Sequence, residues 1–330
     1  MRREQITLAF TAFLGLVVLL GMLAEITGVP KITNRPGTPP LKVADASANA
    51  PLPRPVMGIT PTSPATSATP RPTSPASAAV NGVAVDKFVV MPASVQQNIR
   101  KIYAQGQAGG NNPRAFSKVG DSTIEAPYFL ARFDGGPYNL GDYANLQSVI
   151  EFFAGSFGRP SAAVHKGLHA WSMLNPMWAD KALCQPAESP LGCEFRLHKP
   201  SLVLVRLGAN DTGAPQLFRD SLQAVVAFSI QHGVIPVLGT KPDRHEGSDN
   251  TNNIIIRRLA ADNHIPLWDF DLVAQTLPGR GLDVDGVHMT TFYAHDYTRP
   301  EAFQRGHSVH NLTALIVLDR IWGEIRQNSR

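Results

Sequence analysis

The sequence predicts an α/β protein built on a doubly wound, mainly parallel sheet of five strands, and three observations lead to this prediction. Short apolar runs of strand length recur from residue 115 to residue 270. Helical patterns separate these runs, as expected for successive strand–helix–strand units of a parallel sheet. The chain of 330 residues is 43% hydrophobic, which is enough for one good-sized core.

The expected elements follow one another along the chain. A lead-in helix is expected at 94–105, where SVQQNIRKIYAQ has a helical pattern. In such sheets the functional groups gather at the carboxyl ends of the strands, so we expect functional residues directly after them. The expected strands are 115–120, 161–167, 201–208, 234–240 and 265–270. The other expected helices are 143–154, 215–232, 250–263 and 311–326.

Residues 6–24 form an uncharged run of nineteen residues, about the length of a helix that crosses the hydrocarbon core of a bilayer. We predict an uncleaved membrane anchor, with residues 1–5 held in the cytoplasm by Arg2 and Arg3. This predicts a single-pass protein of the cell membrane whose folded part lies outside the cytoplasm. The alternative is a cleaved signal peptide and a secreted protein.

Residues 25–85 are predicted to be a disordered stalk, and residues 86–330 a single folded domain. Twelve of the 27 prolines fall between Pro30 and Pro75, and residues 30–80 contain no aromatic side chain. A segment of this composition buries too little apolar area to offset the entropy cost of ordering.

The distribution of charge argues against nucleic acid as a partner. Residues 1–85 carry seven Lys and Arg against three Asp and Glu, which accounts for the whole formal net charge of +4. The predicted domain is therefore neutral and lacks the basic surface that neutralises phosphates.

Cys184 and Cys193 are the only cysteines. If the folded part lies outside the cytoplasm, we expect them to form a disulfide that closes a small loop. The alternative is a pair of free thiols. Two cysteines alone make a poor metal site, so no metal is expected.

Polar residues follow the predicted strands at their carboxyl ends. Gly120-Asp121-Ser122 follows the first strand, Gly167 ends the second, and Asn210 follows the third. Beyond the fifth strand, the segment DVDGVHMT contains Asp285 and His288. These segments bring a hydroxyl, a glycine N–H, an amide, a carboxylate and an imidazole to one edge of the sheet. Such a set can perform acyl transfer.

On these motifs the chain resembles the SGNH/GDSL family of serine esterases and lipases, over about residues 110–326. The matching segments, in order, are Gly-Asp-Ser at Ser122, the glycine Gly167, Gly-Ala-Asn-Asp at Asn210, and Asp-x-x-His at Asp285 and His288. The resemblance implies a three-layer α/β/α sandwich of the flavodoxin-like kind. It also implies that Ser122 is the nucleophile and that backbone N–H groups of Ser122 and Gly167, with the Asn210 amide, form the oxyanion hole.

The chemistry explains why these residue types are needed. A serine hydroxyl becomes a good nucleophile when a neighbouring base takes its proton, and His288 would serve as that base. Asp285, three residues earlier, would hold the imidazole in the correct tautomer and stabilise its protonated form.

Several other residues are also candidates for functional groups. Ser156 lies in AGSFG, which is similar to the nucleophile elbow of α/β hydrolases but follows a helical pattern instead of a strand. Arg244 and His245 are expected in a solvated polar loop, with a cleft wall as the alternative. Trp171 and Trp178 are expected in the core, with the same alternative.

The sequence therefore predicts a membrane-anchored, extracytoplasmic serine esterase that cleaves small-molecule or glycan esters through an acyl-enzyme. O-acetyl groups on envelope polysaccharide are the favoured substrate, and no metal or organic cofactor is implied. The alternatives are a lysophospholipase or thioesterase, and a non-catalytic glycan-binding module of the cell wall. Intact Ser122, Asn210, Asp285 and His288 argue against the last of these.

Overall fold

The computed structural model describes residues 79–125 and 127–326, and its centre is a five-stranded sheet with strand order β3-β7-β6-β5-β4. Strands β4 to β7 run parallel, and β3 pairs with β7 in the antiparallel sense. The predicted α/β class with a mainly parallel sheet of five strands is confirmed. The strands are β3 (Val89–Val90), β4 (Asn112–Gly120), β5 (Pro200–Arg206), β6 (Ile235–Gly239) and β7 (Leu267–Trp268).

Two inner strands of the sheet, β5 and β6, are buried along their whole length. Every residue of β5 and of β6 is buried, as expected for strands that helices cover on both faces. The register between β4 and β5 aligns the carboxyl ends of these two strands, because Val119 pairs with Val205 and Gly120 pairs with Arg206. The loops that follow β4 and β5 therefore begin side by side at one edge of the sheet.

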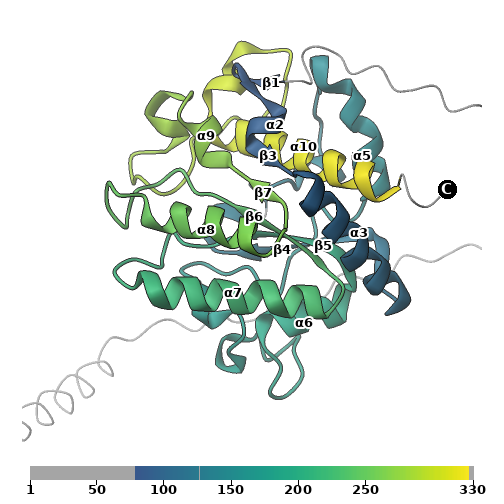
Figure 1. The fold of residues 1–330 in the computed structure, drawn as a ribbon. Helices are drawn as coiled ribbons and strands as arrows, with labels where there is room; N and C mark the ends of the chain where they lie inside the picture. Colours follow the sequence, from purple (N-terminus) through teal and green to yellow (C-terminus); the bar gives the residue numbers. More distant parts are fainter. Residues whose placement is uncertain (1–78, 126, 327–330) are drawn as a thin grey trace, which may run out of the picture. The chain divides into compact units, whose positions relative to one another are not determined.

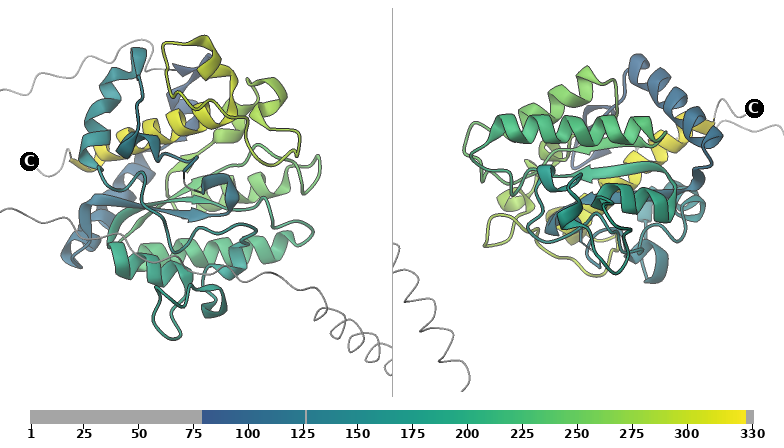
Figure 2. Two further views of the ribbon diagram at one scale, coloured as in Figure 1. Left: turned by 180° about the vertical axis from the view of Figure 1, so that it is seen from behind. Right: turned by 90° about the horizontal axis from the view of Figure 1, so that it is seen from below.

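Helices cover both faces of the sheet and complete the three layers (Figure 1). Helix α6 packs against β4, and helices α7 and α8 pack against each other and against β6. In the view from below, α7 lies in front of the sheet (Figure 2). Helix α10 packs against α3, α5 and α9 in the other layer. The bounds are α3 (Ala93–Ala108), α5 (Gln147–Phe152), α6 (Pro190–His198), α7 (Pro215–Gln231), α8 (Thr251–Asp262), α9 (Phe270–Ala274) and α10 (Gly306–Arg326).

The prediction of a strand at 161–167 is wrong. Only Val164 pairs with the sheet, as an isolated parallel bridge to Gly120. Ser161 explains this locally, because its hydroxyl donates to the Lys118 carbonyl and accepts from the Ala163 N–H. This local turn competes with a continuous ladder. The fifth strand is instead β3.

Some helices also differ from the prediction. The expected helix at 143–154 is a 3-10 segment, η3 (Gly141–Leu146), followed by α5. Helix α6 was not predicted, although Ser189 accepts a hydrogen bond from the Gly192 N–H and Pro190 occupies the first turn. Both are typical signals of a helix start.

Short elements precede β3. Strands β1 (Ala79–Val80) and β2 (Val83–Ala84) form an antiparallel pair, followed by α2 (Val85–Phe88). These residues overlap the end of the predicted stalk. The remainder of the predicted stalk, 25–78, lies outside the described residues, so the division at residue 86 stays a prediction.

The prediction of a single-pass membrane protein must be corrected. No helix within residues 79–125 and 127–326 is long and apolar enough to cross a bilayer. The run 6–24, on which the prediction depended, and the predicted cytoplasmic residues 1–5 lie outside the described residues. The described residues therefore give no support to a location in the membrane.

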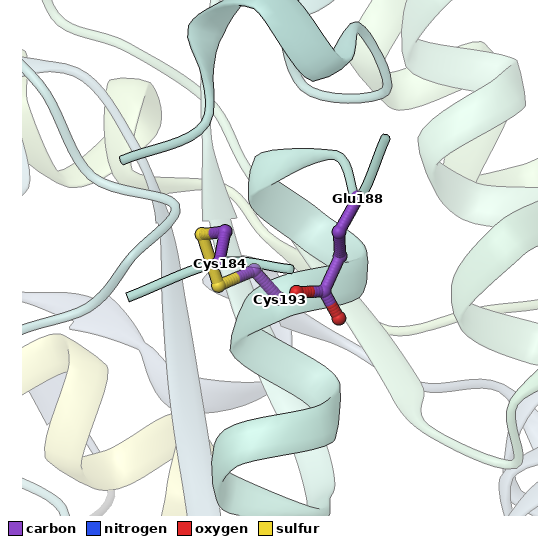
Figure 3. Close-up of side chains that lie close together, drawn as sticks. All are labelled: Cys184, Glu188 and Cys193. Atoms are coloured by element: carbon purple, nitrogen blue, oxygen red, sulfur yellow. A yellow bond between two sulfur atoms is a disulfide. The ribbon is translucent and has the colours of Figure 1, made fainter. Parts of the chain in front are cut away.

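Cys184 and Cys193 form a disulfide, as predicted, and Glu188 lies next to it (Figure 3). The three side chains are close enough to suggest a metal site, but the bonded sulfurs are not thiolates and make no such site in this state. Glu188 instead pairs with Arg196 on α6. The bridge ties the loop before α6 to the helix itself.

Replacing both Cys184 and Cys193 by Ala should lower the free energy of unfolding by about 2–3 kcal/mol, because the bridge closes a short loop in the unfolded chain. The bridge spans a sequence separation of 9. Urea unfolding of the oxidised wild type and the double variant measures the difference. Equal unfolding midpoints would contradict a stabilising role. Ester hydrolysis by the double variant shows whether the loop also affects the predicted catalytic residues Ser122, Asp285 and His288.

Candidate active site

Ser122, His288 and Asp285 form a continuous hydrogen-bonded chain. Ser122 begins the one-turn 3-10 helix η2 (Ser122–Ile124) directly beyond the end of β4. Its Oγ lies 2.9 Å from Nε2 of His288, and Nδ1 of His288 lies 2.6 Å from Oδ2 of Asp285. A carboxylate only accepts hydrogen bonds, so Nδ1 carries the proton that faces Asp285. Nε2 is then free to accept the Ser122 hydroxyl.

A tight turn fixes the Asp285 carboxylate. Its Oδ1 accepts hydrogen bonds from the backbone N–H groups of Val287 and His288, at 3.0 and 2.9 Å. The hydrogen bond from His288, followed by these two N–H groups, lowers the pKa of Asp285 to about 2. Asp285 therefore stays ionised through the neutral range. One carboxylate oxygen holds the backbone turn while the other orients the imidazole.

The site is open to solvent. The side chains of His288 and Asp285 are 50% and 48% exposed, and Ser122 is partly exposed. Solvent therefore reaches His288, Asp285 and part of Ser122.

Asn210 lies beside the residue that precedes Ser122. Its Nδ2 lies 3.4 Å from Oδ2 of Asp121 and donates to the Leu168 carbonyl at 3.2 Å. Asp121 is buried, caps η2 through the Thr123 N–H and hydroxyl, and has its pKa raised by burial. These two contacts account for both hydrogens of the Asn210 amide, and the contact with Asp121 is the longer of the two.

Gly167 lies in the segment that was wrongly predicted as a strand. The segment still approaches the end of β4, because the His165 N–H donates to the Gly120 carbonyl at 3.2 Å. Gly167 lies two residues beyond His165 and is exposed. Its φ of +71° is in the left-handed region that favours glycine. The described contacts do not join Gly167 to Ser122.

Arg206 is a buried charge beneath the site that the sequence did not single out. It ends β5, and its guanidinium lies over the rings of Trp268 and Phe270, at 5.4 and 5.5 Å. Burial lowers its pKa to about 10, although Asp121 and two other carboxylates favour the charged form. The apolar run around Arg206 predicted a strand. An arginine at the end of such a run can be buried or exposed, and the sequence of the run does not distinguish the two.

The other candidate residues lie in three different environments. Ser156 is buried, and its Oγ accepts from the Phe116 N–H, so it supports the core. Arg244 pairs with Asp271 and donates to backbone carbonyls of its own loop. Trp171 and Trp178 are 38% and 41% exposed, so the expectation that they lie in the core is wrong.

No protein-family model and no curated protein match this sequence. Solved structures do match. They include the psychrotrophic esterase EstA from Pseudoalteromonas sp., at 16% identity and TM-score 0.38, over 65% of this chain and 97% of that one. A putative lipolytic protein of the G-D-S-L family from Desulfitobacterium hafniense has 16% identity and TM-score 0.38, over 63% and 98%. The acetylxylan esterase Axe2 from Geobacillus stearothermophilus has 14% identity and TM-score 0.39, over 63% and 94%.

These solved structures are of esterases and of a putative lipolytic protein, the class that the sequence motifs resemble. A likeness this weak assigns no activity to the chain.

Proposed function

We propose that this protein is a serine esterase that hydrolyses carboxylic esters through an acyl-enzyme on Ser122. The observation that carries the proposal is the relay from Ser122 through His288 to Asp285, with separations of 2.9 and 2.6 Å. These are hydrogen-bond distances in the order that nucleophilic catalysis requires.

The reaction has two halves. His288 takes the Ser122 proton at Nε2 as Oγ attacks the ester carbonyl, and Asp285 stabilises the resulting imidazolium. His288 then returns the proton to the leaving alcohol, and the acyl group remains on Ser122. In the second half, His288 takes a proton from water, which attacks the acyl-enzyme. The carboxylic acid leaves and the Ser122 hydroxyl is restored.

Charge that develops on the carbonyl oxygen needs donors. We propose the backbone N–H groups of Ser122 and Gly167 and the side-chain amide of Asn210 for this role. The contact of the Asn210 amide with Asp121, the residue before Ser122, supports the role of Asn210 as a donor, because it brings the amide close to Ser122. The proposed role of the Gly167 N–H as a donor rests on the resemblance of the sequence to the family.

The substrate we favour is an O-acetyl group on a polysaccharide. The half-exposed His288 and Asp285 support it, because an open site can reach a substituent on a large polymer. A lysophospholipase or thioesterase is the second candidate. A non-catalytic glycan-binding module would have no need of the relay from Ser122 to Asp285.

The test is hydrolysis of p-nitrophenyl acetate by the full chain, together with labelling by a fluorophosphonate probe. Turnover with labelling of Ser122, located by peptide mass, is the expected result. A folded protein with neither turnover nor labelling would favour the binding module. The ratio of acetyl to octanoyl ester hydrolysis then separates an acetyl esterase from a lipid hydrolase.

Asn210→Ala should lower kcat by about 10²–10³-fold with a smaller change in KM, since an oxyanion donor acts mainly on the transition state. Asn250→Ala is a suitable comparison, because that amide contacts Asp271 in a different loop. Steady-state kinetics on p-nitrophenyl acetate measures both variants. If Asn210→Ala changed kcat no more than the comparison variant, Asn210 would not be an oxyanion donor.

A further inference from the structure

A cavity of about 500 Å³ lies between the two chain segments that continue from the candidate catalytic residues. One wall is formed by residues 127–136, which begin five residues beyond Ser122. The other is formed by residues 291–295, which begin three residues beyond His288, and by His307. The volume falls within the range of about 300–1,000 Å³ that is typical of small-molecule sites.

Contacts tie the two walls together next to the site. The ring of Tyr128 stacks on that of His307, with centroids 5.6 Å apart. The His307 N–H donates to the carbonyl of Thr290, two residues beyond His288. Arg132 donates to the carbonyl of Tyr293 at 2.9 Å. Each wall is therefore anchored within a few residues of a candidate catalytic group.

The cavity combines aromatic faces with fixed polar groups. Tyr128 and Tyr293 are 47% and 62% exposed, so each presents ring surface to a ligand. Arg132 and Asp134 also line the cavity. Asp134 is held by the N–H groups of Gly155 and Gly158, at 2.7 Å each. The arginine and the aspartate leave the lining with no net formal charge.

This lining suits a sugar ring better than an acyl chain. An acyl chain would desolvate Arg132 and Asp134 without returning any hydrogen bond, which is costly. A pyranose ring has C–H faces that pack on aromatic rings and hydroxyls that both donate and accept. It can therefore satisfy the apolar and the polar parts of the cavity together. A charged ligand would leave either Arg132 or Asp134 facing like charge.

We infer that this cavity binds the sugar ring that carries the ester, with Tyr128 and Tyr293 packing on the ring and Arg132 and Asp134 bonding its hydroxyls. The inference rests on the proposed esterase function and specifies the alcohol part of its substrate. It makes these four residues determinants of specificity that take no part in bond cleavage.

The experiment compares kcat/KM for an O-acetylated cello-oligosaccharide with kcat/KM for ethyl acetate, an ester without a ring, by acetate release. The wild type should prefer the oligosaccharide. Tyr293→Ala and Tyr128→Ala should lower this preference at least tenfold, mainly through the KM for the oligosaccharide. Tyr293→Phe, which keeps the ring, should retain the preference. Trp178→Ala removes an aromatic residue of similar exposure outside the cavity and is the matched control.

The outcomes are distinguishable. Loss of the preference in Trp178→Ala, with none in the tyrosine variants, would place sugar binding elsewhere and overturn the inference. A wild type without preference for the oligosaccharide, or tyrosine variants that chiefly impair ethyl octanoate, would overturn it too. No hydrolysis of any ester, ethyl acetate and p-nitrophenyl acetate included, would instead refute the proposed function.

Discussion

Ser122→Ala should lower kcat for p-nitrophenyl acetate by at least about 10⁴-fold and abolish fluorophosphonate labelling. The variant removes the hydroxyl oxygen that lies 2.9 Å from Nε2 of His288, while His288 and Asp285 keep their mutual contact. Loss of one member of a nucleophile–base pair removes nearly all the benefit of the others. The remaining rate would come from binding and from the oxyanion donors alone.

The fold should tolerate this substitution. The hydroxyl of Ser122 contacts His288 at a half-exposed position and supports no buried group. Circular dichroism and urea unfolding should therefore match the wild type. Ser156→Ala serves as the control serine: it loses the Phe116 N–H contact and some stability, yet should keep labelling and turnover. Turnover that survived in Ser122→Ala and disappeared in Ser156→Ala would reverse the nucleophile assignment.

The sequence could predict the relay because its parts are local. Asp285 and His288 are three residues apart, so one turn is enough to bring the carboxylate to the imidazole. Ser122 follows a buried strand, and the end of a parallel strand points its loop to the functional edge. The long-range step, from His288 to Ser122, required the resemblance to a family and could not be derived from spacing.

Other parts of the fold depend on contacts that no local pattern reveals. The pairing of Val164 with Gly120 stops at a single bridge because Ser161 closes a turn. Strand β3 has two residues and is a strand only because β7 lies beside it. Likewise, the cavity beside the site arises from segments more than 150 residues apart, which the stacking of Tyr128 on His307 joins.

Asp285→Asn should lower kcat by about 10⁴-fold while leaving the backbone turn in place. The two N–H groups of Val287 and His288 would continue to bond an oxygen at the Oδ1 position. The amide oxygen of the new asparagine must occupy that position, so its NH₂ group faces Nδ1 of His288. A donor there forces Nδ1 to accept, which moves the imidazole proton to Nε2. The base would then present a proton to Ser122 instead of a lone pair.

The pH dependence separates this explanation from a loss of structure. Asp285 has a pKa of about 2, so in the wild type its own titration cannot cause a fall in kcat between pH 4 and 8. Asp285→Asn should therefore be impaired across that whole range. Asp283→Asn is the matched control, because Asp283 is exposed in the same turn and bonds only the Val284 N–H through its side chain. Near-normal activity in Asp285→Asn, or equal losses in both variants, would mean that Asp285 does not set the tautomer of His288.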